Sequence, residues 1–314
     1  MKLAITILKQ KELDIKHNME NAARVASNAF EDDADIVLLP EYFNIGLKAR
    51  EHNRSLEIST WILNKSYSRS YYPFIKNITR RIAISKNYIA KDLKEYLKPL
   101  REKAQSYSGK YIAGSLPLKE HKNIYNTGFI IDDQGDIIIK QGKMHPYDYE
   151  HHIVDQYDRL NTISIKGFKT AIMICWDPFE GELENGINKK VQLVLSPTIF
   201  PIYSSALHYS QQRAQHLRKY LYFGCSTLIP EDLPKIPGGA FITGPDINSL
   251  LHEEGYLIEK LNAEKLKEPD HKLKKIILDY NENPHYLSYR SLSEAFRHHE
   301  FTQKSIKDHE KEKE

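Results

Sequence analysis

The chain has 314 residues, of which 40% are apolar and 28% charged, a composition typical of a globular protein with one large or two modest domains. The net charge of +3 is too small to indicate a basic surface for nucleic acid or anionic lipid, and the 20 tyrosines follow no RNA-binding pattern. No apolar run approaches the about 20 residues that span a bilayer. We therefore expect no nucleic-acid partner and no membrane partner.

The N-terminal stretch MKLAITILKQKELD contains a short apolar run followed by charges, without a segment that resembles a cleavage site. We therefore expect a cytoplasmic protein in a reducing compartment. In such a compartment the two cysteines, Cys175 and Cys225, both carry free thiols.

The first 40 residues predict a strand, a helix and a second strand. Residues 2–8 (KLAITIL) read as a strand, and residues 18–30 place five apolar side chains at helical spacing with Asn18 as the N-cap. Residues 34–40 (ADIVLLP) form a short, fully apolar strand. This order predicts an α/β sheet with helices on its face.

The segment from about 50 to 92 is aromatic, basic and Ser-rich, and we interpret it as an enlarged helical region. Residues 93–108 then read as one helix and residues 110–116 as the next strand.

Two hairpins follow. Residues 124–143 contain two apolar runs joined at Gly135, and residues 163–175 turn at Lys166 and Gly167. The remaining predicted elements are a strand at 192–197, a helix at 205–221, and strands at 222–229 and 239–261. We predict one domain over residues 1–285 and a C-terminal extension over 286–314 that ends in a charged tail.

Two of the apolar strands end in residues that carry chemistry. DIVLLP is followed by Glu41, and AIMI is followed by Cys175. Residues just beyond the carboxyl ends of strands line the ligand crevice of open α/β sheets. We therefore expect this carboxylate and this thiol to converge, although they lie far apart in the sequence.

A thiol of ordinary pKa is only slightly ionised at neutral pH, so a catalytic cysteine needs a base or a positive environment. Glu41 can serve as the base if burial raises its pKa. Lys143, just past the first hairpin, supplies a cation that stabilises an oxyanion. Taken singly, Cys175 reads as a core thiol, Glu41 as a helix N-terminal acid and Lys143 as a solvated loop lysine; their contexts together favour catalysis.

Three segments in this order, LLPEYFNIG (38–46), KMHPYDYE (143–150) and ICWDPFEGE (174–182), resemble the signature segments of the nitrilase superfamily of carbon–nitrogen hydrolases. The resemblance covers about residues 1–265 and is interrupted at about 50–92. It implies a four-layer αββα sandwich that pairs into an αββα–αββα homodimer or a higher homo-oligomer.

The resemblance also implies roles for individual residues. Cys175 is the nucleophile, Glu41 the general base and Lys143 the cation that stabilises the oxyanion, aided by the backbone N–H of Trp176. Glu150 matches a second glutamate that positions lysine and substrate, although Asp148 competes for this place. The implied mechanism forms a thioester and uses no metal and no cofactor.

Histidine and the second cysteine receive structural interpretations. His145, His151 and His152 do not predict a metal site, because the adjacent pair cannot easily face one ion and no carboxylate–His motif frames them. We interpret His145 as structural and Cys225 as a core residue.

The substrate is left open by the sequence. The letters CWD, in place of CWE, favour an amidase or N-carbamoyl amidohydrolase over a true nitrilase. We expect substrate-binding side chains at Tyr147, Trp176, Phe179, Phe200 and Arg213, the last with an equally good structural interpretation. The partner would be a small amide, carbamoyl or nitrile compound. An amide-forming acyltransferase with the same triad and a catalytically silent binding protein remain alternatives.

Overall fold

The computed structural model describes residues 1–11, 13–45, 88–146, 150, 153–199, 205–230, 239–271 and 273–274. Most of the predicted helical region at 50–92, the predicted domain boundary at 285 and the extension over 286–314 lie outside these residues. Within the described part, every helix is too short or too polar to cross a membrane. The cytoplasmic location stays a prediction.

The expected strand–helix–strand opening is present as β1 (Lys2–Gln10), α1 (Ile15–Glu31) and β2 (Ile36–Glu41). The expectation of an N-cap at Asn18 is wrong. Asp14 caps α1, because its carboxylate accepts a hydrogen bond from a backbone N–H of the first turn. Asn18 is buried inside α1, and its side-chain amide bonds to backbone groups of two loops instead.

Where the sequence predicts one helix over 93–108, the structure has two, α4 (Leu93–Tyr96) and α5 (Lys98–Gln105). The break falls at Leu97, just before Pro99. Proline has no backbone N–H to continue a helix and is favoured in a first turn, so it begins α5 rather than extending α4.

Both predicted hairpins are present. Their strands are β3 (Tyr111–Glu120), β4 (Asn123–Ile131) and β5 (Ile137–Gly142), then β6 (Ile163–Ile165) and β7 (Phe168–Ile172). Gly135 has φ +73°, and Lys166 and Gly167 have φ +46° and +84°. Two successive positive φ values are those of the tight turn that suits a two-residue hairpin.

The second half adds strands, two helices and two short helical segments; the sequence analysis predicted neither the short segments nor α6. Its elements are η2 (Asp177–Glu180), α6 (Glu182–Asn188), β8 (Leu193–Pro197), α7 (Ser205–Leu217), β9 (Tyr222–Pro230), β10 (Ala240–Thr243), β11 (Asn248–Leu251), β12 (Gly255–Lys260) and η3 (Ala263–Lys265).

The strands form two sheets that are joined through β1. The first sheet has the order β5-β4-β3-β2-β1-β12, and the second has the order β6-β7-β8-β9-β10-β11. Residues 2–7 of β1 pair with β12, whereas residues 7–10 pair in parallel with the end of β9. The central strands β2, β1, β9, β8 and β7 are mutually parallel at their shared edges, so their carboxyl ends meet in one region.

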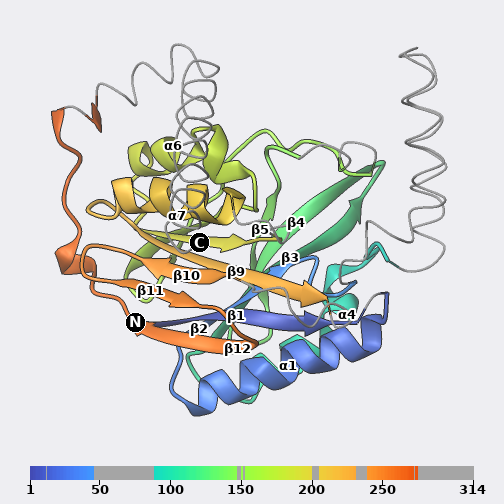
Figure 1. Ribbon diagram of the computed structural model, residues 1–314. Helices are drawn as coiled ribbons and strands as arrows, with labels where there is room; N and C mark the ends of the chain where they lie inside the picture. The colour runs from blue at the N-terminus through green and yellow to red at the C-terminus, as the bar shows by residue number, and fades with distance from the viewer. Residues whose placement is uncertain are drawn as a thin grey trace, which may run out of the picture.

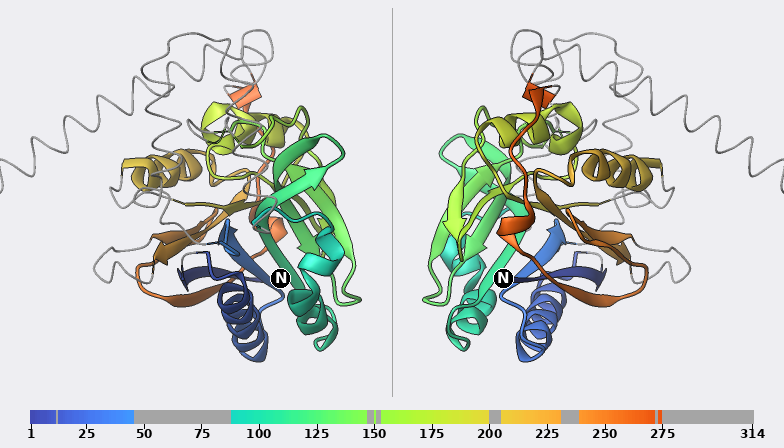
Figure 2. Two further views of the ribbon diagram at one scale, coloured as in Figure 1. Left: turned by 90° about the vertical axis from the view of Figure 1, so that its right-hand side faces the viewer. Right: turned by 90° about the vertical axis from the view of Figure 1, so that its left-hand side faces the viewer.

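Alternation along the buried strands separates three apolar cores. In β1, Leu3, Ile5 and Ile7 face the second sheet, whereas Ala4 and Leu8 face α1. A third core packs the outer face of the second sheet against α6 and α7. Figure 1 shows α1 on one side of the strands with α6 and α7 on the other, and Figure 2 shows α1 beside α5. The predicted α/β class is confirmed; the pairing of two copies stays a prediction.

Ser226 in β9 joins the two sheets by hydrogen bonds. Its buried hydroxyl accepts from the Thr6 backbone N–H at 2.9 Å and donates to the Leu38 carbonyl at 2.7 Å. One side chain of the second sheet thus satisfies backbone groups of β1 and β2 in the first, and it helps to fix where the strand ends meet.

We expect Ser226→Ala to lower the free energy of unfolding by about 1–3 kcal/mol, because the buried Thr6 N–H loses its acceptor. Denaturant unfolding would measure the loss. Ser164→Ala, in the exposed part of β6, is the control and should change stability little. Equal stability of the two variants would contradict this account of the junction.

Candidate active site

The structure brings Glu41 and Cys175 together at the carboxyl ends of their strands. Glu41 is the last residue of β2, and Cys175 lies three residues beyond β7. Each is at or next to a backbone turn with positive φ, +50° at Tyr42 and +50° at Cys175, which L-residues adopt at a cost. The Cys175 thiol and the Glu41 carboxylate are close enough for each to shift the pKa of the other.

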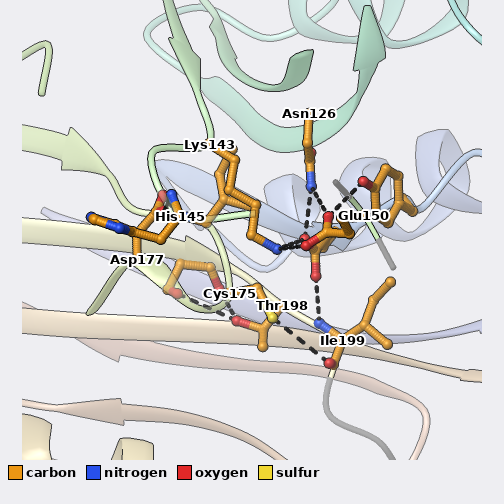
Figure 3. A network of polar contacts seen from close by, with 12 residues as sticks. Asn126, Lys143, His145, Glu150, Cys175, Asp177, Thr198 and Ile199 are labelled. Carbon is orange, nitrogen blue, oxygen red and sulfur yellow. Dashed lines mark hydrogen bonds and ion pairs between the residues drawn. The ribbon is translucent and has the colours of Figure 1, made fainter. Parts of the chain in front are cut away.

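The segment after β8 contacts both groups. The Ile199 backbone N–H donates to Glu41 Oε2 at 3.1 Å, and the Cys175 sulfur lies 3.8 Å from the Ile199 carbonyl oxygen. The Cys175 N–H in turn bonds to the Pro197 carbonyl. Strand β2 of the first sheet and strands β7 and β8 of the second therefore supply the carboxylate, the thiol and the backbone that holds them. Figure 3 shows Cys175 beside Ile199.

Lys143 lies between two carboxylates, only 1% exposed. Its Nζ is 2.9 Å from Glu41 Oε1 and 2.5 Å from Glu150 Oε2. The residue directly follows β5, and its backbone N–H bonds to Asn126 in β4, so the hairpin aims the side chain at the end of β2. All four residues given the main roles from the sequence are thus gathered in one cluster, in which Glu41, Lys143 and Glu150 are buried and Cys175 is partly buried.

Two members of the cluster were missed from the sequence. Asn126 Nδ2 donates to Glu41 Oε1 at 2.7 Å and to Glu150 Oε1 at 3.3 Å, and the Tyr42 hydroxyl donates to Glu150 Oε1 at 2.7 Å. Tyr42 directly follows Glu41, which is a signal in retrospect. Asn126 is a fully buried amide within an apolar strand, but its partners are distant in sequence.

Burial sets the protonation of the cluster. Loss of solvent raises the pKa of Glu41 above its ordinary value, against the attraction of Lys143. Burial also raises the pKa of the Cys175 thiol well above its ordinary value, and the charge of Glu41 raises it further. Burial works to lower the pKa of Lys143, but the facing negative charges outweigh it and raise that pKa well above its ordinary value. At neutral pH the thiol is therefore neutral and the Lys143 side chain is an ammonium group.

The structure describes three of the five residues that we expected to bind substrate. Trp176 is half-buried and stacks on Phe179 at 4.7 Å between ring centroids, beside the cluster. Arg213 donates to the Pro178 carbonyl at 3.1 Å and to both oxygens of Glu184 at 2.8 and 2.7 Å. These bonds tie α7 to η2 and α6.

Tyr147 and Phe200 lie outside the described residues. The substrate-binding roles of Tyr147, Trp176, Phe179, Phe200 and Arg213 therefore stay predictions. Asp148, His151 and His152 are likewise outside the described part.

His145 pairs with a helix rather than with the cluster. Its Nε2 lies 3.1 Å from Glu182 Oε1, at the start of α6. Burial lowers the pKa of His145, but the hydrogen bond to Glu182 and the neighbouring acids raise it above its ordinary value. Within the described ranges, no three His, Cys, Asp or Glu side chains are grouped to hold a metal ion.

Cys225 contrasts with Cys175. Its side chain is fully buried in the core under α7, with the Thr198 hydroxyl 3.4 Å from its sulfur, and burial raises its pKa to about 12. Both cysteines are free thiols.

Comparison with known proteins gives a family match. A family model described as carbon–nitrogen hydrolase matches residues 2–248. The ω-amidase NIT2 of Xenopus tropicalis is 24% identical over 217 residues, which are 65% of this chain and 66% of that protein. The ω-amidase NIT3 of Saccharomyces cerevisiae is 22% identical over 223 residues, 67% of each chain. The chain thus spans about two thirds of the length of these curated relatives.

Solved structures of an amidase from Nesterenkonia sp. AN1 share the fold. A glutamate-to-glutamine mutant with the Michael adduct of acrylamide at its active-site cysteine has a TM-score of 0.61, with 18% identity over 88% of this chain and 99% of that chain. A double mutant in complex with acrylamide has a TM-score of 0.64, with 20% identity over 88% and 96%.

The electrostatics of the cluster predict that Glu41→Gln makes Cys175 more acidic. The substitution removes the negative charge that raises the thiol pKa and leaves the Lys143 charge that lowers it. We expect the midpoint pH of Cys175 alkylation by iodoacetamide, followed by peptide mass mapping, to fall by roughly 1–3 units.

Glu150→Gln is the matched control for this shift. Its charge contributes less to the thiol pKa than that of Glu41 or Lys143, so we expect a smaller shift in the same direction. Cys225 serves as the internal reference that resists labelling. A midpoint that stays in place or rises in Glu41→Gln would contradict the described balance of charges.

Proposed function

The chain belongs to the carbon–nitrogen hydrolase family of the nitrilase superfamily, and on this basis we propose that it hydrolyses a small amide through a thioester on Cys175. The observation that carries the proposal is the buried contact of thiol, carboxylate and ammonium group at the strand ends. Burying such charges costs free energy of desolvation. Groups with pKa values perturbed in this way concentrate at active sites.

In the first step, Glu41 takes the thiol proton as the Cys175 sulfur attacks the amide carbon. The raised thiol pKa means that the sulfur is not ionised in advance, so proton transfer must accompany attack. The raised pKa of Glu41 makes its carboxylate a better proton acceptor than an ordinary glutamate. The C–S bond forms, and the C=O π electrons move to the oxygen.

Lys143 stabilises the oxygen that becomes negative. An ammonium group has three N–H donors, and Glu41 and Glu150 each accept one of them. The third donor meets no acceptor among the residues that the structure describes, so we assign it to the oxyanion. In a buried site such a bond is worth far more than in water. The contribution expected of the Trp176 backbone N–H stays a prediction.

Collapse of the tetrahedral intermediate breaks the C–N bond. The leaving nitrogen takes the proton from Glu41, so ammonia or an amine departs and a thioester remains on Cys175. Glu41, again ionised, then removes a proton from water as the water oxygen attacks the thioester carbon. The C–S bond breaks, the thiolate recovers the proton, and the acid is released.

Glu150 positions Lys143 in this scheme. It accepts three hydrogen bonds, from Lys143, Tyr42 and Asn126, and its charge affects the thiol pKa less than that of Glu41 does. These bonds fix its carboxylate as a counter-ion, whereas Glu41 faces the thiol. The two glutamates are therefore assigned different tasks by their neighbours.

An amide is the favoured substrate class, with an N-carbamoyl amine as the nearest alternative. The distant relatives named as ω-amidases and the amidase whose cysteine reacts with acrylamide support an amide. Assembly into a homodimer or higher homo-oligomer is part of the same proposal.

The test is ammonia release from a panel of primary amides, N-carbamoyl amines and nitriles. We expect release by the native protein and release at background in Cys175→Ala, because the thioester cannot form. Cys225→Ala, which removes the other thiol from the core, is the matched control and should retain activity. Mass spectrometry of Cys175 during turnover should detect the acyl group.

Other outcomes would redirect the proposal. Release from nitriles alone would indicate a nitrilase, and amide product formed only with added amine would indicate an acyltransferase. Silence across the panel, with Cys175 labelled by iodoacetamide no faster than Cys225, would overturn the hydrolase and favour a binding protein on this fold.

A further inference from the structure

Asp177 is a buried carboxylate that the proposed chemistry does not use. It begins η2, two residues after Cys175, and its side chain is fully buried. Oδ1 accepts the backbone N–H groups of Met144 at 3.0 Å and His145 at 2.8 Å, and Oδ2 accepts that of Ile174 at 2.8 Å (Figure 3).

The three N–H groups belong to the two segments that carry the reactive side chains. Met144 and His145 directly follow Lys143, and Ile174 directly precedes Cys175. Both segments have left their strands at these points, since β5 ends at Gly142 and β7 at Ile172. One carboxylate therefore connects the lysine segment to the cysteine segment, which follow two strands, β5 and β7, that do not pair with each other.

Asp177 also braces the strained turn at Cys175. Its own N–H donates to the Ile174 carbonyl at 3.0 Å, so Ile174 is held by its N–H and by its carbonyl. Between these bonds lies Cys175 at φ +50°. A non-glycine residue keeps such a conformation only when its surroundings fix it, at a cost of about 1–3 kcal/mol.

The contacts assign the carboxylate an indirect task. Its described hydrogen bonds all come from backbone N–H groups, and burial raises its pKa to about 7, against the charges of Lys143 and His145. Three backbone donors already occupy both of its oxygens, and none of its described bonds reaches the side chain of Cys175, Glu41 or Lys143. Its effect must pass through the residues that it holds.

We propose that Asp177 is a positioning residue, whose carboxylate sets the place of Lys143 relative to Cys175 by holding both backbone segments. The inference rests on the proposed hydrolase function, in which this spacing decides how well the ammonium group meets the oxyanion. A misplacement of about 1 Å in such an arrangement costs about 100-fold in rate.

Asp177→Asn tests the proposal with little change in shape. An amide has one oxygen, so either Ile174 or the Met144 and His145 pair must face an –NH2 group instead of an acceptor. We expect kcat to fall about 10- to 100-fold with KM changed less than about threefold. Asp177→Glu keeps the charge but moves the oxygens, and it should give an intermediate kcat; it also serves if Asp177→Asn does not fold.

Asp35→Asn is the matched control. Asp35 also accepts a backbone N–H, from Lys2 at 2.7 Å, and a lysine ammonium, from Lys166 at 2.6 Å, but it lies at the other end of the strands. Its variant should keep kcat even where it loses thermal stability. If the two variants lose the same thermal stability and the same kcat, the loss in Asp177→Asn reflects general destabilisation, and the proposal is overturned.

A measurement without substrate separates this inference from the proposed function. The Lys143 charge lowers the Cys175 pKa, so loosening the lysine segment should raise the midpoint pH of Cys175 alkylation in Asp177→Asn. Loss of the Asp177 charge alone would move the midpoint down. In a Lys143→Ala background the rise should vanish. A higher midpoint pH in Asp177→Asn, together with no hydrolysis of any amide by the native protein, would support the positioning role and contradict the proposed hydrolase function. An unchanged or lower midpoint pH would overturn the positioning role.

Discussion

The bonds of Lys143 to Glu41 and Glu150 are the interaction on which the rest of the site depends. An ammonium group and two carboxylates with almost no solvent exposure are tolerable only when each is paired, and here both carboxylates also accept hydrogen bonds from neutral donors. Breaking a buried pair by removing one member typically costs about 3–5 kcal/mol, because the other charge stays buried. The three charged side chains must therefore stay together for the stability of the fold as well as for the proposed chemistry.

The fold brings these charged side chains together because several strands end in one region. β1 belongs to both sheets, and its pairing with β9 directs the carboxyl ends of β2, β8 and β7 to the same region. Ser226 reinforces this junction with bonds to backbone groups of β1 and β2. The hairpin of β4 and β5 then delivers Lys143 from the edge of the first sheet, with Asn126 of β4 touching both glutamates.

Local patterns in the sequence were enough for most elements and for the residues at strand ends. Apolar runs predicted β2 and β7, and Glu41 and Cys175 stood where those runs stopped. Contacts between distant segments were beyond such patterns. Asn126 looks like any polar residue of a strand until Glu41 and Glu150 are seen beside it, and Asp177 acts on backbone groups that carry no sequence signal. The break at Leu97 had a local signal in Pro99, which the helical pattern around it outweighed.

The ratio of two carboxylates to one ammonium group also affects the release of product from the site. The amide of the proposed reaction is neutral and adds no charge beside Glu41 and Glu150, whereas the acid that this reaction forms is an anion at neutral pH. In a region shielded from water, repulsion between that anion and an unbalanced carboxylate is strong. In the proposed reaction, the excess of one negative charge in the cluster therefore opposes retention of the acid product.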